Sequence, residues 1–234
     1  MRRIFPLLAW LLISSAAGGA ESPREIGAFR VHHRWPPSVD ALAASGNTAI
    51  HIGSGYFLTA SHVSQPPHAG DAVGLGIDGA FHPATIIRAG TYDSVDVTLL
   101  RIDPADLPRR LREAPALALC GSPLAPGTQA WVVSAGSDTQ ARILGLADLP
   151  PGIPDRYASL ITNMAGSGQS GSGVLPPSRD CLAGIVSRVV SQTTTRADGS
   201  STSIVLAKYF VPAEEIGRFL SDSLPRPNRP PFQP

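Results

Sequence analysis

Three segments of the sequence carry side chains that together can perform acyl-transfer chemistry. Gly53–Val63 (GSGYFLTASHV) ends by presenting His62, Asp96 stands directly before an apolar run, and the glycine-rich Gly166–Leu175 (GSGQSGSGVL) holds Ser170. A serine hydroxyl is a poor nucleophile at neutral pH, so it needs a histidine to accept its proton and an acid to orient the imidazole. Each segment alone also has a structural interpretation, because acids in turns and glycine-rich linkers are common.

The order histidine, aspartate, serine, spread over two β-rich halves, resembles the chymotrypsin-fold (trypsin-like) serine proteases. Leu58–Val63 (LTASHV) is similar to the family's strand ending in Thr-Ala-x-His, and Asp96–Leu100 (DVTLL) to its Asp-Ile-Ala-Leu-Leu. Gly168–Ser172 (GQSGS) resembles the Gly-x-Ser-Gly of the nucleophile loop, and Gly184–Ser187 (GIVS) the strand that lines the substrate cleft. By motif, the sequence is most similar to bacterial glutamyl-endopeptidase and Deg-like protease domains, over residues 28 to 223.

The resemblance implies a role for each matched residue in a serine endopeptidase that works through an acyl-enzyme intermediate. Ser170 is the expected nucleophile, His62 its general base, and Asp96 the acid that fixes the imidazole tautomer. The backbone N–H groups of Gly168 and Ser170 are expected to form an oxyanion hole. Ser187 is expected to lie beneath Asp96 as a hydrogen-bonding partner.

Two of these assignments have competitors in the sequence. Asp96 is preferred over Asp93 because only Asp96 abuts the apolar strand. Ser170 is preferred over Ser167 and Ser172 because it alone matches Gly-x-Ser-Gly followed by a small residue and a strand. An α/β-hydrolase elbow would need alternating long helices, which the sequence lacks. A catalytically silent member of the same fold, used as a binding module, is the alternative function.

The residue before the cleaved bond (P1) is expected to be a small or medium apolar one. By resemblance, Met164 sets the pocket floor with Ala165 beside it, and Val189 forms a wall. Val186 occupies the place where glutamate-specific relatives use a histidine. None of these side chains is charged, and burying an unpaired charge against them costs several kcal/mol. If the strand is regular, Arg188 alternates away from this pocket toward a neighbouring subsite.

The sequence differs from its relatives in two further ways that concern regulation. Gln169 replaces the aspartate that captures a newly cut N-terminus in digestive members of the family, so that activation switch is expected to be absent. Only ten residues follow Leu224 in this sequence, so we expect no peptide-binding (PDZ) domain of the kind that Deg proteases append.

The elements expected to position these groups are short strands in two β-rich halves. Composition favours this, because 23 glycines and 23 prolines suit turns between strands better than long helices. We expect an all-β fold of two six-stranded Greek-key barrels with a C-terminal helix. The first barrel spans about 28–104, the second about 117–211 and the helix 212–223, with a disordered Pro-rich tail at 225–234; residues 103–126 are expected to be a crossing linker. Predicted strands are 48–52, 56–60, 72–77, 84–88, 97–102, 129–134, 142–146, 158–162, 181–190 and 203–211.

Composition and targeting signals limit which partners and which cellular compartment we expect. The 19 basic and 18 acidic residues give a net charge of +1, so no field attracts nucleic acid or anionic lipid, and a protein or peptide substrate is expected. Arg2 and Arg3 precede a short apolar run, and small residues end at Ala20, which predicts a cleaved signal peptide and a secreted or periplasmic protein. No cofactor or metal is expected. The sequence leaves the oligomeric state open.

Cys120 and Cys181 are the only cysteines. In an oxidising compartment they can form a disulfide, although two buried free thiols are the alternative. We predict the bond.

Overall fold

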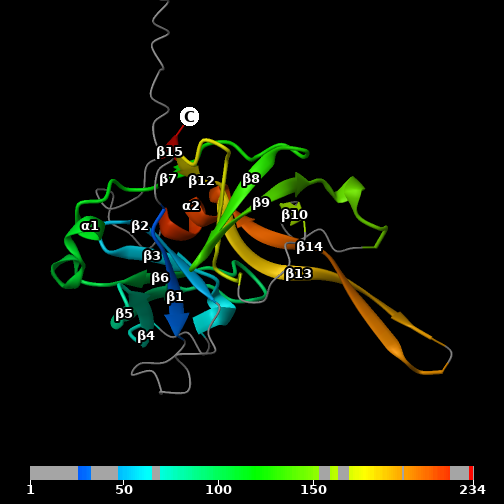
Figure 1. The fold of residues 1–234 in the computed structure, drawn as a ribbon, viewed down its shortest axis with the longest axis horizontal. Coiled ribbons are helices and arrows are strands. Elements are labelled where there is room, and N and C mark those ends of the chain that lie inside the picture. The colour runs from blue at the N-terminus through cyan, green and yellow to red at the C-terminus, as the bar shows by residue number, and fades with distance from the viewer. Residues whose placement is uncertain are drawn as a thin grey trace, which may run out of the picture.

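The strands close into two antiparallel six-stranded barrels, as the sequence predicts (Figure 1). The computed structural model describes residues 26–32, 47–64, 69–152, 159–162, 169–196, 198–221 and 232–233. The expected signal peptide therefore lies outside the described residues. Within the described ranges, no helix is long and apolar enough to cross a membrane.

The first barrel has the strand order β1-β2-β3-β6-β5-β4. Its interior is filled by fully buried side chains such as Phe57, Leu75 and Leu100. The prediction for β4 is confirmed to the residue, while β5 is longer than expected and β1 was not singled out as a strand. The strands are β1 (Ala28–His32), β2 (Thr48–Gly53), β3 (Tyr56–Thr59), β4 (Ala72–Ile77), β5 (Ala80–Ala89) and β6 (Thr98–Arg101).

The second barrel has the order β10-β14-β13-β11-β8-β9. The prediction of one strand from Cys181 to Val190 is wrong in its bounds, because the strand is interrupted at Ala183. The N–H of Ala183 donates to Val174 O at 2.8 Å. The strands are β8 (Gln129–Ser134), β9 (Ser137–Leu144), β10 (Leu160–Thr162), β11 (Gly173–Leu175), β13 (Gly184–Thr195) and β14 (Ser201–Pro212). A short 3₁₀ helix, η4 (Leu146–Asp148), follows β9.

The segment expected to be a plain linker carries structure of its own. It contains η3 (Pro104–Asp106), α1 (Arg109–Arg112) and β7 (Ala118–Cys120). Burial of Leu107, Leu111 and Leu117 explains this, because an apolar residue every few positions anchors the crossing segment.

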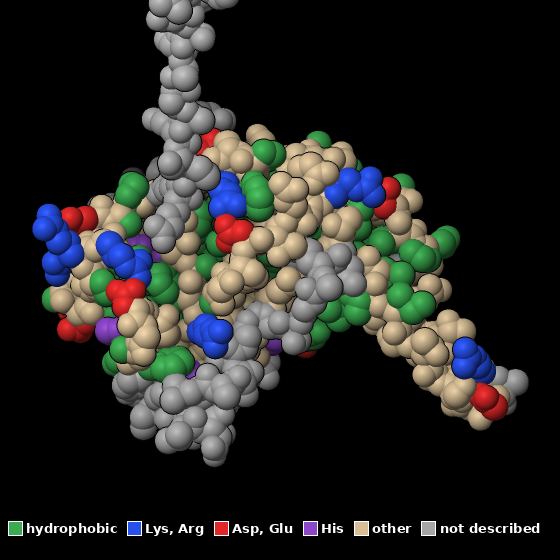
Figure 2. Space-filling model, in the orientation of Figure 1, with side chains coloured by type: hydrophobic (Ala, Val, Ile, Leu, Met, Phe, Trp, Pro, Cys, Tyr) green, Lys and Arg blue, Asp and Glu red, His purple; other side chains and the backbone are tan. Residues whose placement is uncertain are grey.

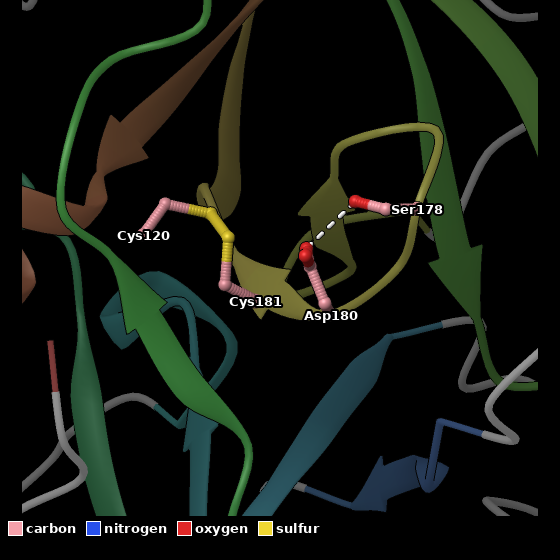
Figure 3. Close-up of a disulfide and its surroundings, with 4 residues drawn as sticks. All are labelled: Cys120, Ser178, Asp180 and Cys181. Carbon is pink, nitrogen blue, oxygen red and sulfur yellow. Dashed lines mark hydrogen bonds between the residues drawn. A yellow bond between two sulfur atoms is a disulfide. The ribbon is translucent and has the colours of Figure 1, made fainter. Parts of the chain in front are cut away.

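A third, three-stranded sheet joins this crossing segment to the second half of the chain. Strand β7 lies between β12 (Cys181–Leu182) and β15 (Phe232–Gln233), both parallel to it. Strand β15 differs from the expectation of a tail disordered throughout; residues 225–231 and 234 lie outside the described residues. The pairing of Cys181 with Ala118 also brings the two cysteines together, and the structure confirms the Cys120–Cys181 disulfide (Figure 3). Next to it, the Ser178 hydroxyl donates to Asp180 at 2.7 Å.

The C-terminal helix α2 (Ala213–Ser221) lies within its predicted bounds. Ile216, Phe219 and Leu220 are buried at helical spacing. From β5, the Arg88 guanidinium donates to the Phe219 carbonyl at 2.8 Å and stacks on the Phe219 ring at 4.6 Å. The helix of the second half is therefore fastened to the first barrel.

One apolar cluster joins the two barrels. It contains Leu58 and Leu99 from the first barrel and Val132 and Val174 from the second. Groups on the facing edges of the barrels are thus held at a fixed separation, which is what a site shared between the two halves requires.

Candidate active site

His62 stands where β3 gives way to the 3₁₀ helix η2 (Ser61–Ser64). Every residue of β3 is buried, so the strand cannot shift without unpacking the first barrel. The turn is closed by the Val63 N–H, which donates to Ala60 O at 3.1 Å. The His62 side chain remains 27% exposed, so part of the imidazole is accessible from outside the protein.

Asp96 is fully buried and accepts four hydrogen bonds. Its Oδ2 lies 2.8 Å from His62 Nδ1 and accepts from Ser187 Oγ at 2.6 Å. Its Oδ1 accepts from Ser61 Oγ at 2.6 Å and from the His62 backbone N–H at 3.0 Å. Asp93, the competing acid, is exposed in the turn before Asp96.

These donors decide the charge of Asp96. Burial alone would raise the pKa of the carboxyl, but hydrogen bonds from His62, Ser187 and Ser61 outweigh burial and lower the pKa to about 2. Asp96 is therefore a carboxylate at neutral pH and favours a proton on His62 Nδ1, which frees Nε2 to act as a base. Sequence reasoning missed Ser61, because a serine in a turn carries no signal of its own.

Ser170 lies on the other side of the imidazole, with its Oγ 2.9 Å from His62 Nε2. Its loop is tied to both barrels. The Ser170 carbonyl accepts from the Thr48 N–H at 2.9 Å, and the Gly171 N–H donates to Val186 O at 2.8 Å. Gly171 has φ of +84°, and a Cβ there would lie 2.0 Å from Thr48 O, so this position requires glycine.

The competing serines differ from Ser170 in their surroundings. Ser172 is fully buried, and its hydroxyl has no hydrogen-bond partner among the described residues. Ser167 lies outside the described residues, as does Gly168, the other expected oxyanion donor. The structure therefore brings together His62, Asp96 and Ser170, with Ser187 beneath the acid.

Of the expected pocket residues, Met164 and Ala165 lie outside the described residues. Val186 is buried in the cluster between the barrels, whereas Val189 is 55% exposed. The strand is not regular here, because the pairing with β14 shifts by one residue between Val186 and Val189. The regular alternation assumed for Arg188 therefore does not hold.

At this bulge Arg188 contacts Tyr92, a neighbour of His62. The carbon of its guanidinium lies 3.4 Å from the centroid of the Tyr92 ring, and that ring meets the His62 ring edge-on with centroids 5.7 Å apart. Tyr92 and Arg188 thus form a wall beside His62 that the sequence did not predict.

Lys208 is a second group that sequence reasoning missed. Lys208 lies in β14, where it pairs with Val189 of β13, and it is only 6% exposed. Its Nζ donates to the side-chain Oε1 of Gln169, the residue before Ser170. Burial lowers the pKa of Lys208. The available signal was a single lysine within the otherwise apolar run from Ile204 to Val211.

The described part of the chain offers no group of three or more histidine, cysteine or acidic side chains able to hold a metal ion. A cavity of about 320 Å³ is lined by residues that include His51 and Arg110, and not by His62, Asp96 or Ser170. Burial, with a smaller contribution from the charge of Arg110, lowers the pKa of His51 to about 4, so His51 is neutral at pH 7.

The comparisons with known proteins agree with the observed fold. A family model of the trypsin-like peptidase domain matches residues 47–185. Among solved structures, the active form of the Rv3671c protease from M. tuberculosis is 18% identical, with coverage of 84% of this chain and 80% of that chain and a TM-score of 0.54. Kallikrein-related peptidase 10 is 17% identical over 86% and 98% of the two chains, with a TM-score of 0.55. A mutant of human heparin binding protein (CAP37) is 12% identical over 88% and 94%, also with a TM-score of 0.55. At these identities the structures show the fold alone. No curated protein sequence matches the chain.

Proposed function

Because this chain belongs to the trypsin-like peptidase family and is a serine protease, we propose that it is a secreted endopeptidase whose catalytic triad is His62, Asp96 and Ser170. One observation carries the assignment. Asp96 Oδ2, His62 and Ser170 Oγ form a hydrogen-bonded line of 2.8 and 2.9 Å between residues up to 108 positions apart in the chain. A line of this order is what nucleophile activation requires.

The reaction follows from this geometry. Ser170 Oγ attacks the carbonyl carbon of the scissile peptide while His62 Nε2 takes the hydroxyl proton. His62 then gives that proton to the leaving amine as the C–N bond breaks, which leaves an acyl ester on Ser170. A water molecule, deprotonated by His62, hydrolyses the ester and restores the enzyme. Asp96 stabilises the imidazolium in both halves.

We assign the oxyanion hole by resemblance to the backbone N–H groups of Gly168 and Ser170. These donors would stabilise the charge that develops on the carbonyl oxygen, and losing one such donor costs roughly 100-fold or more in rate.

The preference for an apolar P1 residue remains our proposal and rests on Met164, Ala165 and Val189. Lys208 is a charged group that pairs with Val189 across the sheet, but its ammonium already donates to Gln169. A peptide-library profile dominated by apolar P1 residues supports the proposal. A profile dominated by Asp or Glu would contradict it and assign Lys208 to the pocket.

We place the protein in the periplasm or outside the cell, with the signal peptide cleaved near Ala20. The Cys120–Cys181 disulfide supports an oxidising compartment. N-terminal sequencing of exported protein tests this, and a mature chain that still begins at Met1 would refute cleavage.

Labelling with a fluorophosphonate tests the triad, because only an activated serine reacts with it. We expect wild type to be labelled, Ser170→Ala to be neither labelled nor active, and Ser172→Ala to behave as wild type. Ser172 is a matched control, since its hydroxyl is two residues away and fully buried. Labelling that survives in Ser170→Ala would overturn the nucleophile, and a wild type that is never labelled would favour the silent binding module.

A further inference from the structure

The half-buried side chain of Arg188 lies in the wall beside His62. Its guanidinium carbon is 3.4 Å from the centroid of the Tyr92 ring, and that ring lies 5.7 Å from the His62 ring, centroid to centroid. Both partners of the stack adjoin residues that hold Asp96. Ser187, the residue before Arg188, donates its hydroxyl to this acid at 2.6 Å. Tyr92 belongs to the turn that precedes the acid. A positive charge is therefore held at a defined place beside the proposed catalytic base.

The hydrogen bonds of this guanidinium are incomplete. Two of its nitrogens, Nε and Nη2, are buried and have no hydrogen-bond partner among the described residues. No carboxylate in the described part of the chain forms an ion pair with Arg188. Buried donors of a charged group cost free energy when they stay without acceptors. Arg188 therefore gains more than an exposed arginine does when an anionic acceptor arrives.

Other arginines of the chain do find acceptors. Arg179 pairs with Asp138 at 2.6 Å, and blue side chains lie beside red ones over most of the face shown in Figure 2. Arg88 is the most informative comparison, because its guanidinium also stacks on a ring from the other half of the chain. It stacks on Phe219 and at the same time donates to the carbonyl of that residue. A stack that served only to fasten the two halves together would satisfy the donors of Arg188 in the same way.

We propose that Arg188 is a specificity-determining residue that binds a carboxylate side chain of the substrate at P2 or P3, the second or third residue before the scissile bond. This inference rests on the proposed function and names its substrate class as peptides with Asp or Glu at that position. A guanidinium and a carboxylate can form two parallel, charge-assisted hydrogen bonds. The carboxylate reaches the shielded nitrogens as the guanidinium slides along the Tyr92 ring, a movement that preserves the stack.

Two features of the structure select the position. Val189, the wall assigned to the P1 pocket, directly follows Arg188 in the chain, so the ligand of Arg188 lies on the acyl side of the scissile bond. The distances from His62 to the Tyr92 ring and from that ring to the guanidinium together correspond to two or three residues of extended chain, at about 3.3 Å per residue. A lysine at this position would meet a like charge and be rejected.

Matched peptides test the proposal on wild type. All share one P1 residue and one leaving group, and they carry Glu, Gln or Lys at P2 in one set and at P3 in the other. Glutamine is the control, because it has the size of glutamate without its charge. In one of the two sets, we expect kcat/KM to be roughly tenfold higher, or more, for the Glu peptide than for the Gln peptide, and lowest for the Lys peptide. Equal values within both sets would overturn the proposal.

Variants of Arg188 assign the preference to its guanidinium. The ratio of kcat/KM for the Glu and Gln peptides is taken within each enzyme, so that a general loss of activity cancels. We expect Arg188→Gln to abolish the preference, and Arg188→Lys to keep part of it, because an ammonium retains the charge but not the planar pair of donors. Arg101→Gln is the matched control and is expected to keep the wild-type ratio. Arg101 is exposed on β6 and also stacks on a tyrosine ring, that of Tyr56, at 5.5 Å.

The outcomes separate this inference from the proposed function. A preference that survives in Arg188→Gln, or that Arg101→Gln reduces equally, would refute the role of Arg188. Raising the salt concentration is expected to weaken the wild-type preference, because part of the pair is open to solvent. A preference independent of salt would show that charge is not what is recognised. Equal cleavage of all peptides by wild type removes the inference and leaves the triad in place. Cleavage by Ser170→Ala, or none by wild type, would instead refute the proposed function, and the inference with it.

Discussion

Replacing Asp96 by asparagine separates the two contributions of its charge, to stability and to catalysis. The side chain keeps its shape but loses the carboxylate that accepts four hydrogen bonds. The amide N–H₂ group faces donors on at least one side, so some of these contacts become repulsive. Asp93→Asn is the matched control, because Asp93 is exposed three residues earlier.

The effect on stability follows from the shift of the Asp96 pKa from 3.8 to about 2. Because the pKa is lower in the folded state, the carboxylate stabilises the fold above the unfolded-state pKa, and this contribution is lost as the pH falls through about 2. At 1.36 kcal/mol per pKa unit, the contribution is about 2 kcal/mol at neutral pH and well under 1 kcal/mol at pH 2.

Urea unfolding at a series of pH values measures this directly. We expect Asp96→Asn to unfold about 2 kcal/mol more easily than wild type at pH 7, with the difference shrinking steadily between pH 4 and pH 2. Asp93→Asn is expected to match wild type throughout. In the same preparations, kcat of Asp96→Asn is expected to fall by roughly 10⁴-fold, because the amide favours the wrong tautomer of His62.

Two results would refute this reasoning. A stability difference that stays constant from pH 7 to pH 2 would show that the carboxylate charge is not what the four donors stabilise. A variant with normal kcat would show that Asp96 does not orient His62, and loss of activity in Asp93→Asn would move the acid to that residue.

The remaining predictions concern Ser187, the contact of Gln169 with Lys208, and the disulfide. Ser187→Ala is expected to lower kcat severalfold with little change in KM, as steady-state kinetics on one peptide would show; an unchanged kcat would contradict a role for its bond to Asp96. Gln169→Leu removes the side-chain oxygen to which the buried Lys208 ammonium donates. We expect this single variant to lower Tm more than the double variant Gln169→Leu, Lys208→Met, because the double variant also removes the buried charge. Calorimetry measures both Tm values, and a lower Tm for the double variant would refute the prediction. Replacing both Cys120 and Cys181 by alanine opens a link across 61 residues and is expected to cost about 4 kcal/mol in urea unfolding; a loss under 1 kcal/mol would show that the link constrains little.

Local patterns in the sequence located many of the strands and the residues of the proposed catalytic site. Strands 72–77 and 129–134 were predicted to the residue, because turn residues on either side delimit short β-rich runs. The motifs around His62, Asp96 and Ser170 pointed to one site, because each motif fixes a side chain relative to its own strand. Fold class followed from the order of these motifs through resemblance.

Tertiary structure alone decided which groups surround those residues. Nothing in the sequence marks Ser61, and only its place in an apolar run marks Lys208, because the roles of both residues depend on partners 35 and 39 positions away. The bulge that turns Arg188 toward Tyr92 is a mismatch between two strands and cannot be seen in either one. A free strand edge is likewise a property of the assembled sheet. The sequence of β13 is that of an ordinary strand, and only the pairing shows that β11 covers Gly184 and Ile185 while no described strand covers the rest of that edge.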